Sequence, residues 1–251
     1  MFLSRCLAAI VVLLWAAVCQ GAAPLRIATI DGPPWGVLGA DGQPTGMMFE
    51  ISNRIAQEAG FTSTNQLIPY ARIGPEMEHG KIDFVLRFSS EEMVKQATPV
   101  AVVVTMPVIA LGRQGSRFRD VADLRGTTVG VVRKSRYTDQ FDNDPLIRKV
   151  EADNYLQIVR LLKMKRLDAG VGASAGLFYS AHMAGIKADE LGVPLVIGSN
   201  DFVLHFSKTT GNPEVLKALN MAVKRLNQRG EIKKIIDSYM GDYQFNFATT
   251  P

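Results

Sequence analysis

Short apolar runs alternate with amphipathic stretches along most of the chain. Residues 25–29 and 128–132 are short and apolar, and residues 100–111 form a longer run rich in β-branched side chains. Such runs are typical of buried strands. Further strands are expected at residues 82–86, 167–172, 195–198 and 202–206.

The amphipathic stretches between these runs have helical spacing. Residues 46–59 place apolar side chains on one helical face, and Gly60 is a natural stop. Asn212 followed by Pro213 is a favoured helix start, and Gly230 ends that helix. Other helices are expected at 72–79, from Ser135, from Asp153, from Ser174 to near Gly185, and at 231–240. Alternating strands and helices predict an α/β fold with mainly parallel sheets flanked by helices.

The first residues have the pattern of a secretory leader. Arg5 precedes an almost unbroken apolar run over residues 7–18, and small residues follow it. This run is short for a transmembrane helix, so we expect a signal peptide over residues 1–21 and a soluble periplasmic protein after cleavage. A lipid anchor on Cys19 is the alternative, although the bulky Val18 fits a lipobox poorly.

Composition narrows the chemistry of the mature chain. Both cysteines, Cys6 and Cys19, lie in the leader, so disulfides, thiolate catalysis and Cys-ligated metals are not expected. Removal of Arg5 lowers the net charge from +4 to +3. The sequence contains no run of Lys and Arg residues of the kind that would indicate nucleic-acid binding. No metal-ligand spacing, cofactor motif or catalytic motif is found, so we expect no metal, no cofactor and no catalytic residues.

Six short motifs occur in an order that resembles the family 3 extracellular solute-binding proteins, the receptors of polar amino-acid ABC importers. The resemblance spans about residues 25–241. It rests on the loop Pro33-Pro34-Trp35, on Gly46-Met47-Met48-Phe49-Glu50-Ile51, on Gly80-Lys81-Ile82-Asp83, on Asp123-Leu124-Arg125-Gly126 leading to Val129-Gly130-Val131, on Arg166-Leu167-Asp168-Ala169, and on the closing pairs Leu226/Gly230 and Ile235/Tyr239.

The resemblance implies a type II periplasmic-binding-protein fold whose two lobes close over a ligand. Lobe 1 would comprise residues 22–110 and 204–251, and lobe 2 residues 111–203, with crossings near 110–112 and 203–206. It also implies a monomer that delivers a small molecule to an inner-membrane ABC permease, or reports it to a membrane sensor. A lyase similar to cyclohexadienyl dehydratase is the alternative on the same scaffold.

Two ligand contacts of the amino-acid receptors are missing here. The family's Arg, which pairs with the ligand carboxylate, aligns with Met93 or Lys95. The family's Asp, which pairs with the ligand ammonium, aligns with Ala173. Because a buried ammonium without an anionic partner is costly, an ordinary α-amino acid in the usual pose is not expected.

Positive charge stands at other positions of the expected cleft. Arg87 ends a strand, Arg136 follows Ser135 at an expected helix start, and Arg72 opens the helix before Arg87. Guanidinium groups suit carboxylates, and helix starts favour anions, so we expect an anionic ligand, either a carboxylate or a modified amino acid. The remaining candidate contacts are Trp35, Ser135, Asp31, Phe88, Ser89, Tyr70 and Tyr137.

Each candidate also has a structural explanation. Ser89 with Glu92 fits a capping box, so Ser89 could serve as a helix cap. Arg72 and Arg136 could be solvated charges at helix ends, and Trp35 could simply pack in the core. Sequence patterns alone leave these alternatives open.

Overall fold

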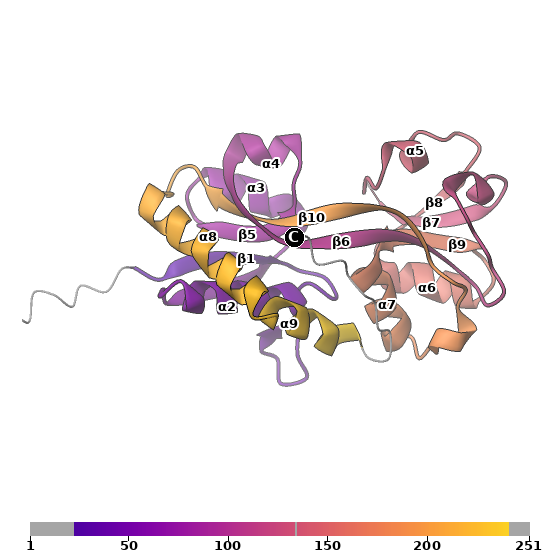
Figure 1. The fold of residues 1–251 in the computed structure, drawn as a ribbon, viewed down its shortest axis with the longest axis horizontal. Helices are drawn as coiled ribbons and strands as arrows, with labels where there is room; N and C mark the ends of the chain where they lie inside the picture. Colours follow the sequence, from indigo (N-terminus) through magenta and orange to yellow (C-terminus); the bar gives the residue numbers. More distant parts are fainter. Residues whose placement is uncertain (1–22, 134, 241–251) are drawn as a thin grey trace, which may run out of the picture.

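The computed structural model describes residues 23–133 and 135–240, so the expected signal peptide lies outside the described residues. Within them, one eight-stranded sheet has the order β4-β1-β5-β10-β6-β9-β7-β8, with helices on both of its faces (Figure 1). No helix in the described part is both long and apolar enough to cross a bilayer. The expected α/β class, with parallel strands and flanking helices, is confirmed.

The first lobe lies on the left of Figure 1 and is built on three parallel strands, β1 (Leu25–Ile30), β4 (Ser63–Ile68) and β5 (Phe84–Phe88). A small hairpin, β2 (Val37–Leu38) with β3 (Pro44–Thr45), precedes helix α2. The helices of this part are α2 (Met47–Glu58), α3 (Tyr70–Glu78) and α4 (Glu91–Gln96).

The second lobe repeats this construction. Its parallel strands are β7 (Thr128–Val132), β8 (Arg148–Ala152) and β9 (Ala169–Ala173). Its helices are η1 (Val121–Leu124), α5 (Asp139–Asp142), α6 (Tyr155–Lys163), α7 (Ser174–Met183) and η2 (Ala188–Glu190).

Two long antiparallel strands, β6 (Ala97–Gly112) and β10 (Leu195–Ser207), connect the lobes. Phe202 to Phe206 of β10 pair with β5, and Val108 to Gly112 of β6 pair with β9. Between them lie three pairs, Thr105–Asp201, Met106–Asn200 and Pro107–Ser199, beside which no third strand of the described residues lies. We call these three pairs the unsupported stretch. The crossings expected at 110–112 and 203–206 lie a few residues away from it, where β9 or β5 already pairs with the two long strands.

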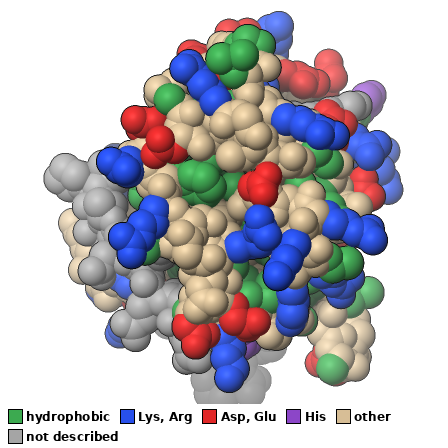
Figure 2. Space-filling view, turned by 90° about the vertical axis from the view of Figure 1, so that its right-hand side faces the viewer, with side chains coloured by type: hydrophobic (Ala, Val, Ile, Leu, Met, Phe, Trp, Pro, Cys, Tyr) green, Lys and Arg blue, Asp and Glu red, His purple; other side chains and the backbone are tan. Residues whose placement is uncertain are grey.

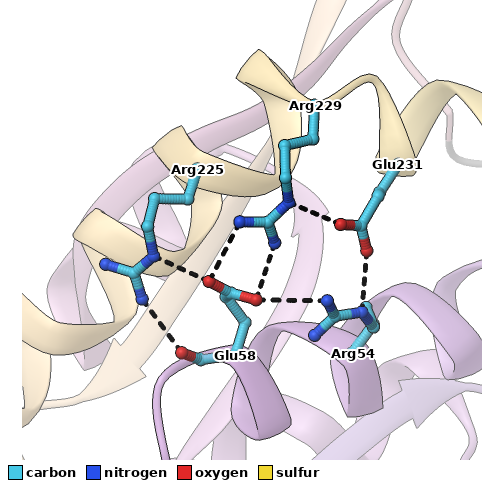
Figure 3. Close-up of polar contacts among 5 residues, drawn as sticks. All are labelled: Arg54, Glu58, Arg225, Arg229 and Glu231. Carbon is cyan, nitrogen blue, oxygen red and sulfur yellow. Dashed lines mark hydrogen bonds and ion pairs between the residues drawn. The ribbon is translucent and has the colours of Figure 1, made fainter.

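The chain ends in helices that return to the first lobe, α8 (Pro213–Gln228) and α9 (Glu231–Met240). An ion-pair cluster fixes them to α2 (Figure 3). Glu58 accepts hydrogen bonds from Arg225 at 2.7 Å and from Arg229 at 2.7 Å, and Arg54 bridges Glu58 and Glu231 at 3.1 and 2.8 Å.

One large hydrophobic cluster extends through both lobes. It joins α2, α8 and α9 to α6 and α7 beneath the sheet as drawn in Figure 1. Tyr179 of α7 and Tyr239 of α9 contact each other with ring centroids 6.3 Å apart, so the last helix also bridges the lobes. Smaller clusters lie under α3 and α4 and beside α5.

The structure differs from the sequence expectations in several elements. Strands β4 and β8 were not predicted, and the two short strands expected at 195–198 and 202–206 are one strand with irregular register. The caps of α6 and α7 are Asn154 and Ala173, not Asp153 and Ser174. No helix begins at Ser135, because α5 starts only at Asp139 after its cap Thr138.

Candidate ligand-binding site between the lobes

The carboxyl ends of the parallel strands in the two lobes point toward the same stretch of the β6/β10 ribbon. Phe88, the last residue of β5, pairs with Phe202, whereas Ala173, the last residue of β9, pairs with Val108. The three unsupported pairs lie between these points. Ligands of α/β sheets bind at the carboxyl ends of strands, so the loops on these two facing edges form the candidate site.

Arg87 is the buried cation of this site. It lies next to the end of β5, with only 7% of its surface exposed. Its guanidinium stacks over the Tyr70 ring, 4.2 Å from the centroid, and donates a hydrogen bond to the Tyr70 hydroxyl. Within the described residues no carboxylate forms an ion pair with it, and burial lowers the pKa of Arg87 from its ordinary value.

The other two candidate arginines are exposed and already paired. Arg72, in the first turn of α3, has 67% of its side chain exposed and pairs with Glu76 at 2.5 Å. Arg136 has 70% of its side chain exposed and pairs with Asp142 at 3.4 Å. Both therefore differ from Arg87, which is buried and forms no ion pair with a carboxylate of the described residues.

An aromatic cluster supports the first-lobe side of the site. Trp35 and Phe88 both contact Phe202, with ring centroids 4.8 and 4.0 Å apart. Gly46 fixes the Trp35 loop against α2, because a Cβ at Gly46 would lie 2.7 Å from the Trp35 carbonyl oxygen, and its φ of 125° suits glycine. Trp35 itself is buried, so part of its role is core packing.

Ser89 is exposed directly after β5, beside a buried histidine. The imidazole Nε2 of His205 lies 3.3 Å from the Ser89 hydroxyl, and its Nδ1 lies 3.0 Å from the Val203 carbonyl. The capping function considered for Ser89 belongs instead to Ser90, whose hydroxyl accepts a hydrogen bond from the Met93 amide. Ser89 is therefore not the cap of α4.

The second-lobe side is formed by a loop where a helix start was expected. Ser135 and Arg136 are exposed in this loop, whereas Tyr137 is buried and its hydroxyl accepts a hydrogen bond from the Val132 amide at 3.0 Å. This bond holds the chain against β7, and burial raises the pKa of Tyr137. The expectation that Arg136 stands at a helix N-terminus is wrong, and the helix-dipole argument for anion binding there no longer applies.

The structure places the residues that were aligned with the two family contacts as follows. Met93 is buried in the cluster under α3 and α4, and Lys95 is exposed in the last turn of α4. Ala173 is buried, and its amide donates to the Tyr155 hydroxyl at 3.2 Å. Asp31, which follows β1, is exposed.

Sequence reasoning missed three residues of this region. Phe202 and His205 belong to a segment that was predicted only as a strand and a crossing between the lobes, and no motif distinguishes them. Ser174 was considered only as a cap, yet it is fully buried and its hydroxyl has no hydrogen-bond partner in the part of the chain that the structure describes.

The geometry can be compared with known proteins. The sequence profile of the bacterial extracellular solute-binding proteins, family 3, matches residues 25–242. The chain belongs to this family. The "Probable amino-acid-binding protein YxeM" of Bacillus subtilis (strain 168) is 22% identical over 210 residues, which cover 80% of this chain and 78% of that protein.

Solved structures of similar fold are amino-acid-binding proteins. An ancestral arginine-binding protein bound to arginine has a TM-score of 0.69 and 22% identity, covering 88% of this chain and 100% of its own. The GluR0 ligand-binding core in complex with L-glutamate has a TM-score of 0.72 and 17% identity, covering 88% and 99%. The two-lobed fold of this solute-binding family is thereby confirmed.

Positive charge is not confined to the facing edges. Lys and Arg side chains also gather on the outer end of the second lobe, with a few carboxylates among them (Figure 2). Arg113 and Lys163 line a surface hollow in this lobe, and Arg113 pairs with Asp168 at 3.0 Å. Surface charge alone therefore does not distinguish the facing edges from the rest of this lobe.

Proposed function

We propose that this family 3 protein is a monomeric periplasmic receptor that binds a small anionic compound between its lobes and presents it to an ABC importer. In this proposal residues 1–21 are a cleaved signal peptide, and the lobes comprise residues 22–110 with 204–251, and 111–203. The supporting observation is Arg87, a buried guanidinium without a carboxylate partner among the described residues. An isolated buried charge costs several kcal/mol, and a ligand carboxylate would supply the missing partner.

The proposed ligand lacks the free ammonium of an ordinary amino acid. The position that would hold the family's ammonium-binding Asp is Ala173, a buried methyl group. Carboxylates whose nitrogen is acylated or otherwise modified satisfy both constraints. We also propose that the protein converts nothing, because Asp31 and Glu91, the acidic residues considered for the cleft, and Glu92, whose charge acts on Arg87, are all exposed and lack the burial that would prepare a general acid.

Thermal denaturation with matched compounds tests the proposal. N-acetyl-L-alanine and its neutral amide differ only in the carboxylate, so only the acid is expected to stabilise the protein. At one hundred times its dissociation constant a ligand adds about 2.7 kcal/mol to the free energy of unfolding, which raises the Tm by about 5–10 °C. L-arginine and L-glutamine should have little effect.

Two variants separate the site from general charge effects. Arg87→Gln should abolish the response to the acid, whereas Arg72→Gln, an exposed arginine at the same end of the lobe, should preserve it. Tight binding of L-arginine or of the neutral amide, with no response to any carboxylate, would contradict an anionic ligand.

A further inference from the structure

The direction of the Ser89 hydroxyl is determined by its buried neighbour. A carbonyl oxygen can only accept a hydrogen bond, so His205 Nδ1, 3.0 Å from the Val203 carbonyl, carries a proton. In a neutral imidazole the other nitrogen is then an acceptor. The Ser89 hydroxyl, 3.3 Å from Nε2, must donate its only proton to the ring.

The surroundings keep this imidazole neutral. His205 is fully buried, and burial together with the nearby charge of Arg87 lowers the pKa of His205 to about 4. At neutral pH the ring therefore has a single proton. Protonation of Nε2 would place a second cation beside Arg87, which again is disfavoured.

We propose that His205 orients Ser89 so that the hydroxyl offers only acceptor lone pairs to the interlobe side, and that Ser89 thereby selects ligands with an N–H or O–H donor near their anionic group. This inference rests on the proposed function, because it assumes that the ligand lies against Arg87 and Ser89. The inference adds a second requirement to the proposed ligand: Arg87 selects the negative charge, and Ser89 selects a hydrogen-bond donor beside that charge.

The orientation can be measured without any ligand. In a protein labelled with ¹⁵N-histidine, with the exposed His79 and His182 replaced by Gln, the spectrum at pH 7 should show a neutral His205 with its proton on Nδ1. Ser89→Ala should shift the Nε2 resonance, because that nitrogen loses its hydrogen bond. A proton on Nε2, or a cationic ring at pH 7, would overturn the inference.

The selectivity can be measured with a second matched pair. N-acetyl-L-alanine and O-acetyl-L-lactate have the same charge and nearly the same shape, but the lactate has an ester oxygen in place of the N–H. The wild type should bind the amide about tenfold more tightly, the effect of one hydrogen bond. Ser89→Ala should abolish this preference, whereas Ser90→Ala should destabilise α4 and leave the preference intact.

The possible failures are distinguishable. Equal binding of amide and ester by the wild type would overturn the role of Ser89 and leave the anionic ligand standing. If N-acetyl-L-alanine, O-acetyl-L-lactate and all other carboxylates fail to bind, the proposed function is wrong, and so is the requirement for a hydrogen-bond donor beside the anionic group. The imidazole spectrum still decides whether His205 orients the hydroxyl.

Discussion

Replacement of Arg87 by Met should make the ligand-free protein more stable while it removes ligand binding. Methionine retains an unbranched apolar stem and lacks the charge that burial disfavours. Most core substitutions destabilise a protein by about 1 kcal/mol, so the expected sign is unusual and therefore informative. A binding site that holds an unpaired charge trades stability for affinity.

The magnitude follows from the contacts of Arg87. An uncompensated buried charge costs about 3–5 kcal/mol. Two contacts to Tyr70 offset part of this: a hydrogen bond to the charged group contributes about 1.5 kcal/mol, and the cation–π contact about 0.5–1 kcal/mol, both at the low end because Tyr70 is exposed. Relief of the burial cost, less the loss of these two contacts, leaves a net gain of about 0.5–3 kcal/mol for Arg87→Met, or about 1–12 °C in Tm.

The assay is thermal and urea denaturation of both proteins at pH 7, with and without the carboxylate that binds the wild type best. The variant should lose affinity for that compound by about thirtyfold or more, because a charge pair in a desolvated site is worth at least about 2 kcal/mol. Arg72→Met, at an exposed ion pair, should change neither quantity by more than about 0.5 kcal/mol. A lower Tm for Arg87→Met, or undiminished binding, would refute the reasoning.

Three further predictions concern the scaffold. The arginines around Glu58 lower the pKa of its carboxyl to about 2, so the stabilising effect of the ionised carboxylate is present above about pH 4.5 and is lost as the pH falls toward 2. The variant Glu58→Gln should therefore be less stable than the wild type at pH 7, and its Tm should change less between about pH 4.5 and 2. Parallel Tm–pH curves for the two proteins would contradict this. Phe202→Ala should cost about 3–5 kcal/mol in urea denaturation and weaken ligand binding, because Trp35 and Phe88 lose their common support; unchanged affinity would exclude that support role. Gly172→Ala should cost about 1–3 kcal/mol, because its Cβ would lie 2.1 Å from the Tyr155 ring, and a wild-type Tm would show that the ring can move freely.

Sequence patterns predicted the helices that bury one face and the strands that are buried on both faces. The helices α2, α8 and α9 and the strands β1 and β7 lie close to their expected positions, since each has a clear apolar stripe or run. Strands β4 and β8 were missed for the opposite reason. They are the two edges of the sheet, and their sequences, STNQLI and RKVEA, are mostly polar and only partly buried, so neither contains an apolar run.

The candidate site was predictable only where it departs from the family pattern. Arg87 was recognised because a cation replaces a small residue at a strand end. Arg136 was misplaced because no local pattern shows that residues 135–137 form a loop, which the hydrogen bond from the Val132 amide to the buried Tyr137 hydroxyl holds in place. His205 and Phe202 could not be identified, since their roles depend on pairing across β5 and β10, which no local pattern reports.

The cluster around Glu58 has a consequence for how the chain is made. Glu58 emerges early from the ribosome, yet Arg225 and Arg229 are synthesised more than 160 residues later. Until then α2 lacks both its ionic partners and the apolar face of α8, so the first lobe cannot close its core during most of translation. A chain built in this order cannot complete its first lobe cotranslationally, so that lobe forms only after nearly all of the protein has been synthesised.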